Sequence, residues 1–146
     1  MAEDTEDNRD TGAVSDKRER EQALDPSRSF IVQAPAGSGK TALLIQRFLL
    51  TLSYVSRPEE VLAITFTKKA ASEMHERIYG ALVRAEAGTV GNDENSRAEL
   101  DYARAALERS SELGWDLVEN PARLQVQTID SFSAALARRM PLMSKL

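Results

Sequence analysis

Lys40 and Thr41 are the two side chains whose position in this sequence most clearly indicates chemistry. They follow a turn of small residues that ends in Gly37, Ser38 and Gly39, and the sequence becomes strongly apolar directly afterwards. Small residues let the backbone curl around a phosphate, so that successive N–H groups point inward. Lys40 can then reach the β- and γ-phosphates of a nucleotide, and the Thr41 hydroxyl can bind Mg²⁺.

The stretch fits the pattern G-x-x-x-x-G-K-[ST] of a phosphate-binding P-loop, with one departure. Ala34 stands where the pattern has glycine, and alanine is tolerated there if the backbone needs no positive φ. The alternative is a tight strand-to-helix turn without a ligand, but such a turn has no need of Lys40 and Thr41. We therefore predict a nucleoside-triphosphate site formed by Ala34, Pro35, Ala36, Gly37, Ser38, Gly39, Lys40 and Thr41.

Several predicted elements must position this loop. Residues 30–33 favour a buried strand, residues 39–54 are apolar on nearly every face of a helix, and residues 61–65 indicate a second buried strand. A strand, a helix and a further strand predict a βαβ unit with parallel strands and a right-handed crossover. A third strand is expected at 124–128, with helices at 68–83, 96–113 and from 130 or 131 to 139.

Composition limits the class of protein. The 146 residues, 42% of them hydrophobic, suit one domain, and the net charge of −4 gives no global sign of nucleic-acid binding. The absence of cysteine excludes disulfides and thiolate metal sites, which suits a cytoplasmic protein. No apolar run approaches the roughly 20 residues that span a bilayer, so no membrane partner is expected. Residues 1–15 are acidic and almost free of apolar side chains, which predicts a disordered tail.

Three segments, taken together, resemble a known family. Residues 64–78, with Thr65-Phe66-Thr67, Ala70-Ala71, Glu73-Met74 and Arg77, look like motif Ia (T-F-T-x-x-A-A-x-E-M-x-x-R) of superfamily 1 DNA helicases of the UvrD/Rep/RecB type. Residues 34–41 are similar to motif I of that family, in which alanine at the first position is usual. Residues 127–132 resemble motif Ib, with Asp130 where histidine is common, a variant associated with AddA- and RecB-like helicase–nucleases.

The resemblance covers about residues 16–146 and implies an α/β fold. The expected architecture is part of a RecA-like P-loop NTPase domain, with a parallel sheet of about three strands, flanking helices and a helical insertion at about 84–122. The implied activity is DNA unwinding driven by ATP hydrolysis, in recombination or repair, with ATP and Mg²⁺ as cofactors and Lys40 as a catalytic residue. Its implied partners are single-stranded and duplex DNA and a second RecA-like domain, and it leaves open an exonuclease domain or a separate nuclease partner.

The resemblance also implies where DNA binds. Ligands of open α/β sheets lie at the carboxyl ends of the strands, where threonine hydroxyls and lysines can bind phosphates and a phenylalanine can stack on a base. The alternatives are that Phe66 is a core residue, that Ser131 only caps a helix and that Phe132 only packs. The predicted DNA-binding residues are Thr65, Phe66, Thr67, Lys68, Thr128, Ser131 and Phe132.

Two features remain open at this point. In the family, a glutamine about 20 residues before the P-loop lysine contacts adenine; Gln22 lies 18 residues before Lys40, Glu19 falls nearer the usual spacing, and Gln22 is otherwise a surface glutamine. The carboxylate pair that activates water is also missing, because Asp93-Glu94 lies in a polar loop. We therefore expect the N-terminal piece of a longer helicase that cannot turn over ATP alone. The alternatives are a non-hydrolysing nucleotide- or DNA-binding module and a small-molecule kinase, which has no use for the residue 65–77 pattern.

Overall fold

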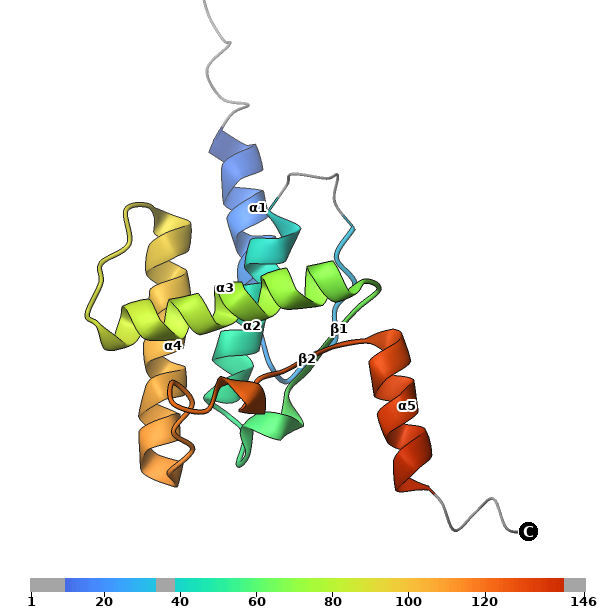
Figure 1. The fold of residues 1–146 in the computed structure, drawn as a ribbon. Helices are drawn as coiled ribbons and strands as arrows, with labels where there is room; N and C mark the ends of the chain where they lie inside the picture. The colour runs from blue at the N-terminus through green and yellow to red at the C-terminus, as the bar shows by residue number, and fades with distance from the viewer. Residues whose placement is uncertain (1–9, 34–38, 141–146) are drawn as a thin grey trace, which may run out of the picture.

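The computed structural model describes residues 10–33 and 39–140. Helices dominate this part of the chain, and two short strands lie among them (Figure 1). In chain order the elements are α1 (Asp10–Ala23), α2 (Lys40–Leu52), η1 (Pro58–Glu60), β1 (Leu62–Thr65), α3 (Lys68–Glu86), α4 (Glu94–Leu113), η2 (Pro121–Arg123), β2 (Gln125–Thr128) and α5 (Ile129–Arg139), where η marks a single 3₁₀ turn.

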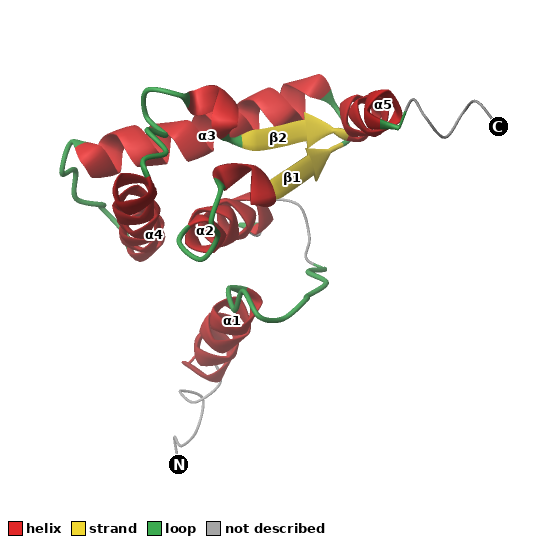
Figure 2. Cartoon of the chain, turned by 90° about the horizontal axis from the view of Figure 1, so that it is seen from below, coloured by secondary structure: helices red, strands yellow, loops and turns green. Residues whose placement is uncertain are grey.

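Strands β1 and β2 form a parallel pair, and both point toward α5 (Figure 2). Leu62 lies opposite Gln125 at one end, and Thr65 lies opposite Thr128 at the other. Because the strands are parallel and in register, the segments that follow them leave the sheet at the same edge. The mixed α/β character and the parallel pairing agree with the sequence prediction.

The strand predicted at residues 30–33 is not formed, and the described sheet therefore has two strands instead of three. Ile31 is 91% exposed, although the prediction placed it in a buried strand. A strand exists only when a neighbour pairs with its N–H and C=O groups. Within the described residues neither β1 nor β2 pairs with this segment, so its apolar pattern alone does not produce a strand.

The hydrophobic core lies between α2, α3, α4 and the inner face of the sheet. Helix α2 is apolar on most faces because it is covered by both other helices: α4 runs alongside it, and α3 crosses them (Figure 1). The side chains that are fully buried here include Ile45, Leu49, Leu52, Ile78 and Leu82. Ala63 and Val126 pack against this core from the sheet, whereas Leu62 and Ile64 on the opposite face of β1 are exposed.

Helix α4, in the segment expected as an insertion, is an integral part of this core. Leu100, Ala103 and Ala106 are buried against the other helices. At the end of the helix, Trp115 is buried and its indole N–H donates to the carbonyl of Ser56 at 3.1 Å. Removal of this segment would therefore expose α2 and α3.

Each of three helices begins with a side-chain cap. Thr67 accepts from the Ala70 N–H at the start of α3 (3.1 Å), Asp93 from the Ser96 N–H at the start of α4 (2.7 Å), and Thr128 from a backbone N–H of α5. Such caps satisfy N–H groups that have no partner inside the helix. No helix in the described ranges is long and apolar enough to cross a membrane.

Candidate nucleotide site and DNA edge

The described part of the predicted P-loop is its junction with α2. Gly39 has a φ of 85°, a left-handed conformation that glycine adopts without strain, and α2 begins at Lys40. Lys40 is half-buried and Thr41 is exposed in the first helical turn, where the backbone N–H groups have no partner within the helix. The predicted residues Ala34, Pro35, Ala36, Gly37 and Ser38 lie outside the described residues.

A pocket of about 370 Å³ lies between α1 and the start of α2. Gln22, Glu19 and Lys40 all line it, so the structure brings the candidate adenine contact and the P-loop lysine to one cavity. Gln22 is exposed, and Phe30 closes the pocket from the loop after α1. The arrangement suits a ligand with a polar, negatively charged end near Lys40.

Arg20 is a pocket residue that sequence analysis did not identify. Its Nε donates to Asp16 at 3.2 Å, and a methyl group added to Gly39 would lie 2.9 Å from its Nη2. The guanidinium tip therefore lies against the backbone just before Lys40. The sequence signal was the spacing of four residues between Asp16 and Arg20, which predicts a helical ion pair but not the direction of the side chain.

Arg47 connects the loop after α1 to α2. Its guanidinium donates to the carbonyls of Ala23, Asp25 (3.1 Å) and Arg28 (2.8 Å), and it lies 5.6 Å from the centre of the Phe30 ring. Hydrogen bonds from a charged donor are stronger than neutral ones. This single side chain therefore fixes the wall of the pocket that carries Phe30.

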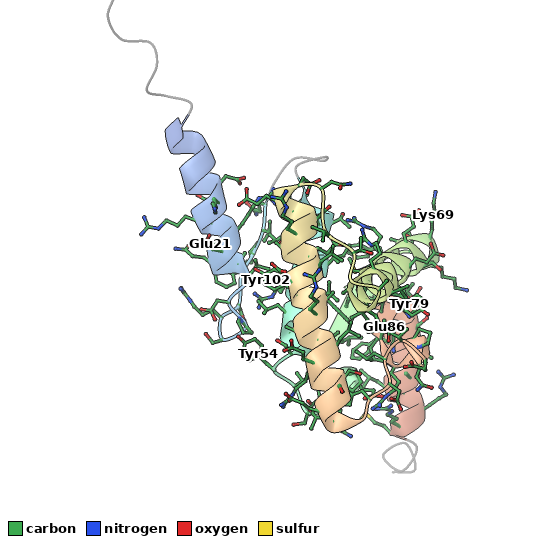
Figure 3. The ribbon with its side chains drawn as sticks, turned by 90° about the vertical axis from the view of Figure 1, so that its left-hand side faces the viewer. Glu21, Tyr54, Lys69, Tyr79, Glu86 and Tyr102 are labelled. Carbon is green, nitrogen blue, oxygen red and sulfur yellow. The ribbon has the colours of Figure 1, made fainter. Side chains whose placement is uncertain are left out.

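The two predicted DNA-contacting segments lie side by side at one edge of the sheet. Thr65 and Thr128 are paired at the carboxyl ends of β1 and β2. Phe66, which follows Thr65 directly, is 89% exposed, so the alternative that it is a core residue is wrong. Lys68 and Lys69 open α3 nearby, both exposed, and Figure 3 shows Lys69 pointing away from the protein at the end of that helix.

The threonines at this edge also have structural roles. The Thr65 hydroxyl donates to the Thr67 carbonyl at 3.0 Å. Thr128 is only 7% exposed; its hydroxyl donates to the Ser131 Oγ at 2.9 Å and accepts from the Ser131 N–H at 3.2 Å. Ser131 itself is exposed. Thr128 is thus the residue that caps α5, a role that sequence analysis gave to Asp130 or Ser131.

Phe132 lies at a different place from Phe66. It is half-buried and lines a groove of about 200 Å³ between α5 and the outer face of the sheet, together with Leu62, Leu136 and Arg139. The structure therefore separates the two phenylalanines that the sequence grouped together. The Asp93-Glu94 pair lies at the start of α4, where Asp93 caps the helix and Glu94 pairs with Lys17 at 3.1 Å.

The fold and these sites define an α/β protein with parallel strands and a helix that starts in a glycine–lysine–threonine turn. Residues 15–143 match the family model of the UvrD/REP helicase N-terminal domain. The chain belongs to this family, whose fold is RecA-like.

The curated relatives are AddA proteins, which are ATP-dependent helicase/nuclease chains. The chain is 32% identical to that of Lactobacillus acidophilus over 123 residues, which are 84% of this chain and 9% of the relative. It is 42% identical to that of Desulfitobacterium hafniense over 96 residues (63% of this chain, 7% of the relative). The chain thus spans less than a tenth of the length of these relatives. No solved structure matches the chain significantly.

Proposed function

We propose that this chain is the ATP-binding N-terminal part of an ATP-dependent DNA helicase that acts in recombination or repair. The family and the relatives support this assignment, and the geometry is consistent with it. DNA unwinding and translocation, the second RecA-like domain, and a nuclease domain or partner belong to the proposal for the longer protein.

The nucleotide part of the proposal rests on the start of α2. Lys40 would bind the β- and γ-phosphates, and Gln22 would contact adenine in the same pocket. Thr41 is exposed one residue after Lys40, which fits a hydroxyl ligand to Mg²⁺ beside the phosphates. Bound Mg²⁺ would neutralise charge on the transferred phosphoryl group.

The observation that carries the DNA part is the register of the sheet. Because Thr65 is paired with Thr128, the residues that follow β1 and β2 meet at one edge, with the exposed Phe66 ring between sheet and solvent. Phe66 would stack on a base of single-stranded DNA, while Lys68 and the exposed Ser131 would bind phosphates. Thr65, Thr67 and Thr128 would shape this edge through their hydrogen bonds.

A second hypothesis is that the chain binds nucleotide or DNA without hydrolysis. The positions of Asp93 and Glu94 favour this for residues 1–146 alone, because both carboxylates serve the start of α4. We therefore expect binding of Mg–ATP without release of phosphate from the 146-residue chain.

Binding of two ligands to matched variants tests the proposal. Lys40→Ala should weaken Mg–ATP binding by about tenfold to a hundredfold, since a hydrogen bond to a charged group is lost, and should leave single-stranded DNA binding intact. Phe66→Ala should weaken DNA binding by about tenfold, because a stacked base is lost, and should leave ATP binding intact.

Ile31→Ala is the matched control for Phe66→Ala, because Ile31 is equally exposed but lies outside the sheet edge. Equal effects of these two variants on DNA affinity would contradict the DNA edge. Retained ATP affinity in Lys40→Ala would overturn the nucleotide site. ATP binding without DNA binding would leave only the nucleotide-binding module.

A further inference from the structure

The guanidinium of Arg20 is held in a defined direction at the nucleotide pocket. Asp16, one helical turn earlier, accepts from its Nε at 3.2 Å. The other two nitrogens lie toward α2: a methyl group on Gly39 would be 2.9 Å from Nη2 and 3.5 Å from Nη1. The Arg20 side chain is 28% exposed, which is much less than that of Asp16 at 68%.

We propose that Arg20 contacts the phosphates of the bound nucleotide, as a second cation opposite Lys40. This inference rests on the proposed function and names a further binding residue of the same site. A guanidinium presents two parallel donors that match a phosphate, whereas an ammonium acts as a point charge. Arg20 and Lys40 line one pocket from two different helices, so a polyphosphate between them would be held from both sides.

The position of Arg20 favours phosphate over the base. Its tip lies against Gly39, the residue directly before Lys40, where the unpaired N–H groups at the start of α2 attract anions. Gln22 and Phe30 line the remainder of the pocket and offer an amide and a ring to a base. The Asp16 carboxylate fixes the direction of the guanidinium and therefore makes Arg20 a pre-oriented ligand.

Competition binding on the 146-residue chain tests this assignment. The probes are Mg–ATP and inorganic tripolyphosphate, each displacing a fluorescent ATP analogue. Arg20→Ala should weaken both by about tenfold, because hydrogen bonds from a charged donor to phosphate are lost. Arg20→Lys should recover part of the affinity, since it keeps the charge without the fork.

Asp16→Ala is the matched control, because it removes the same ion pair from α1 but keeps the guanidinium. It should change ATP affinity by less than about threefold, since an exposed ion pair contributes little. Equal losses in Asp16→Ala and Arg20→Ala, with equal losses of α1 helicity by circular dichroism, would show that Arg20 only stabilises the helix and would overturn the proposal. Loss of ATP affinity with unchanged tripolyphosphate affinity would assign Arg20 to the base and would also overturn it.

Lys40→Ala separates this inference from the proposed function. If Lys40→Ala weakens ATP binding and Arg20→Ala does not, the inference is wrong and the nucleotide site stands. If neither variant changes ATP affinity, or if the unmodified chain binds no ATP, the nucleotide site itself is wrong.

Discussion

The nucleotide side and the DNA edge of this molecule are stabilised to different degrees by the chain itself. At the DNA edge, β1 and β2 pair in register, and α3 and α5 are capped by Thr67 and Thr128. The nucleotide side joins α1 to α2 through a small cluster of buried residues, Ala23, Leu24 and Leu43, and through Arg47. The predicted strand at residues 30–33 has no partner in the described sheet.

This difference shows what each motif needs in order to adopt its geometry. The DNA edge needs two neighbouring strands and local caps, and all of these lie within residues 62–131. The nucleotide side needs a strand whose backbone groups are paired from elsewhere. We therefore expect changes in the core to affect both regions, and changes at Arg47 to affect the nucleotide side alone.

Leu49→Ala should have the largest effect and should remove the difference between the two regions. Leu49 is fully buried in α2, and its truncation leaves a cavity between the three core helices. The expected loss is about 3 kcal/mol of unfolding free energy. Urea unfolding, followed by circular dichroism, measures this loss.

Leu44→Ala is the control for this core variant. It makes the same change in the same helix, but Leu44 is 50% exposed, so its cost should stay below about 1 kcal/mol. Equal costs for the two variants would mean that α2 is not packed between α3 and α4.

Arg47→Ala should sharpen the comparison by weakening the nucleotide side selectively. The variant loses the donor to the carbonyls of Ala23, Asp25 and Arg28, which costs about 2 kcal/mol in local opening. Amide hydrogen exchange should become faster in residues 16–24 and remain unchanged in α3 and α4.

Arg97→Ala is a suitable control for Arg47→Ala, because Arg97 donates through Nε to a single carbonyl, that of Gly91, at 3.3 Å. It should leave exchange in α1 unchanged. Faster exchange throughout the protein in Arg47→Ala would show that α1 and the core unfold as one unit.

Local sequence signals predicted most of the fold. Helix α3 begins at Lys68 as expected, because Thr67 caps it and Pro58-Glu59-Glu60 ends the preceding loop. Both described strands lie within their predicted ranges, since β-branched and apolar residues run to Thr65 and Thr128. The same local signal at residues 30–33 failed, because pairing with a neighbour is not encoded within four residues.

The site shows the same division between local and tertiary information. The exposed position of Phe66 agrees with its place directly after a strand. The contact of Arg20 with Gly39 and the burial of Thr128 depend on how helices pack, and no spacing in the sequence specifies them. Sequence analysis therefore selected Gln22 from α1, although Arg20 lies closer in space to the start of α2.

The ion pair between Glu59 and Arg123 should have the smallest effect, and it tests the side of the core remote from the nucleotide pocket. Arg123 donates to both carboxylate oxygens, at 2.8 and 3.2 Å, and thereby joins η1 to η2. The hydrogen bond from Arg123 lowers the pKa of Glu59 below its ordinary value of 4.5. Because the unfolded chain then binds the proton more readily, the stabilisation is present above this ordinary pKa and is lost as pH falls through the lower folded pKa.

Glu59→Gln measures this contribution, since the amide does not titrate. The variant should be less stable than the unmodified chain by less than about 1 kcal/mol at neutral pH, because both side chains are partly exposed. The difference in unfolding free energy should shrink as the carboxylate is protonated, and the Arg47→Ala variant should show the same pH dependence as the unmodified chain. A difference that grows toward acid pH would mean that Glu59 is destabilising as an anion, contrary to its contact with Arg123.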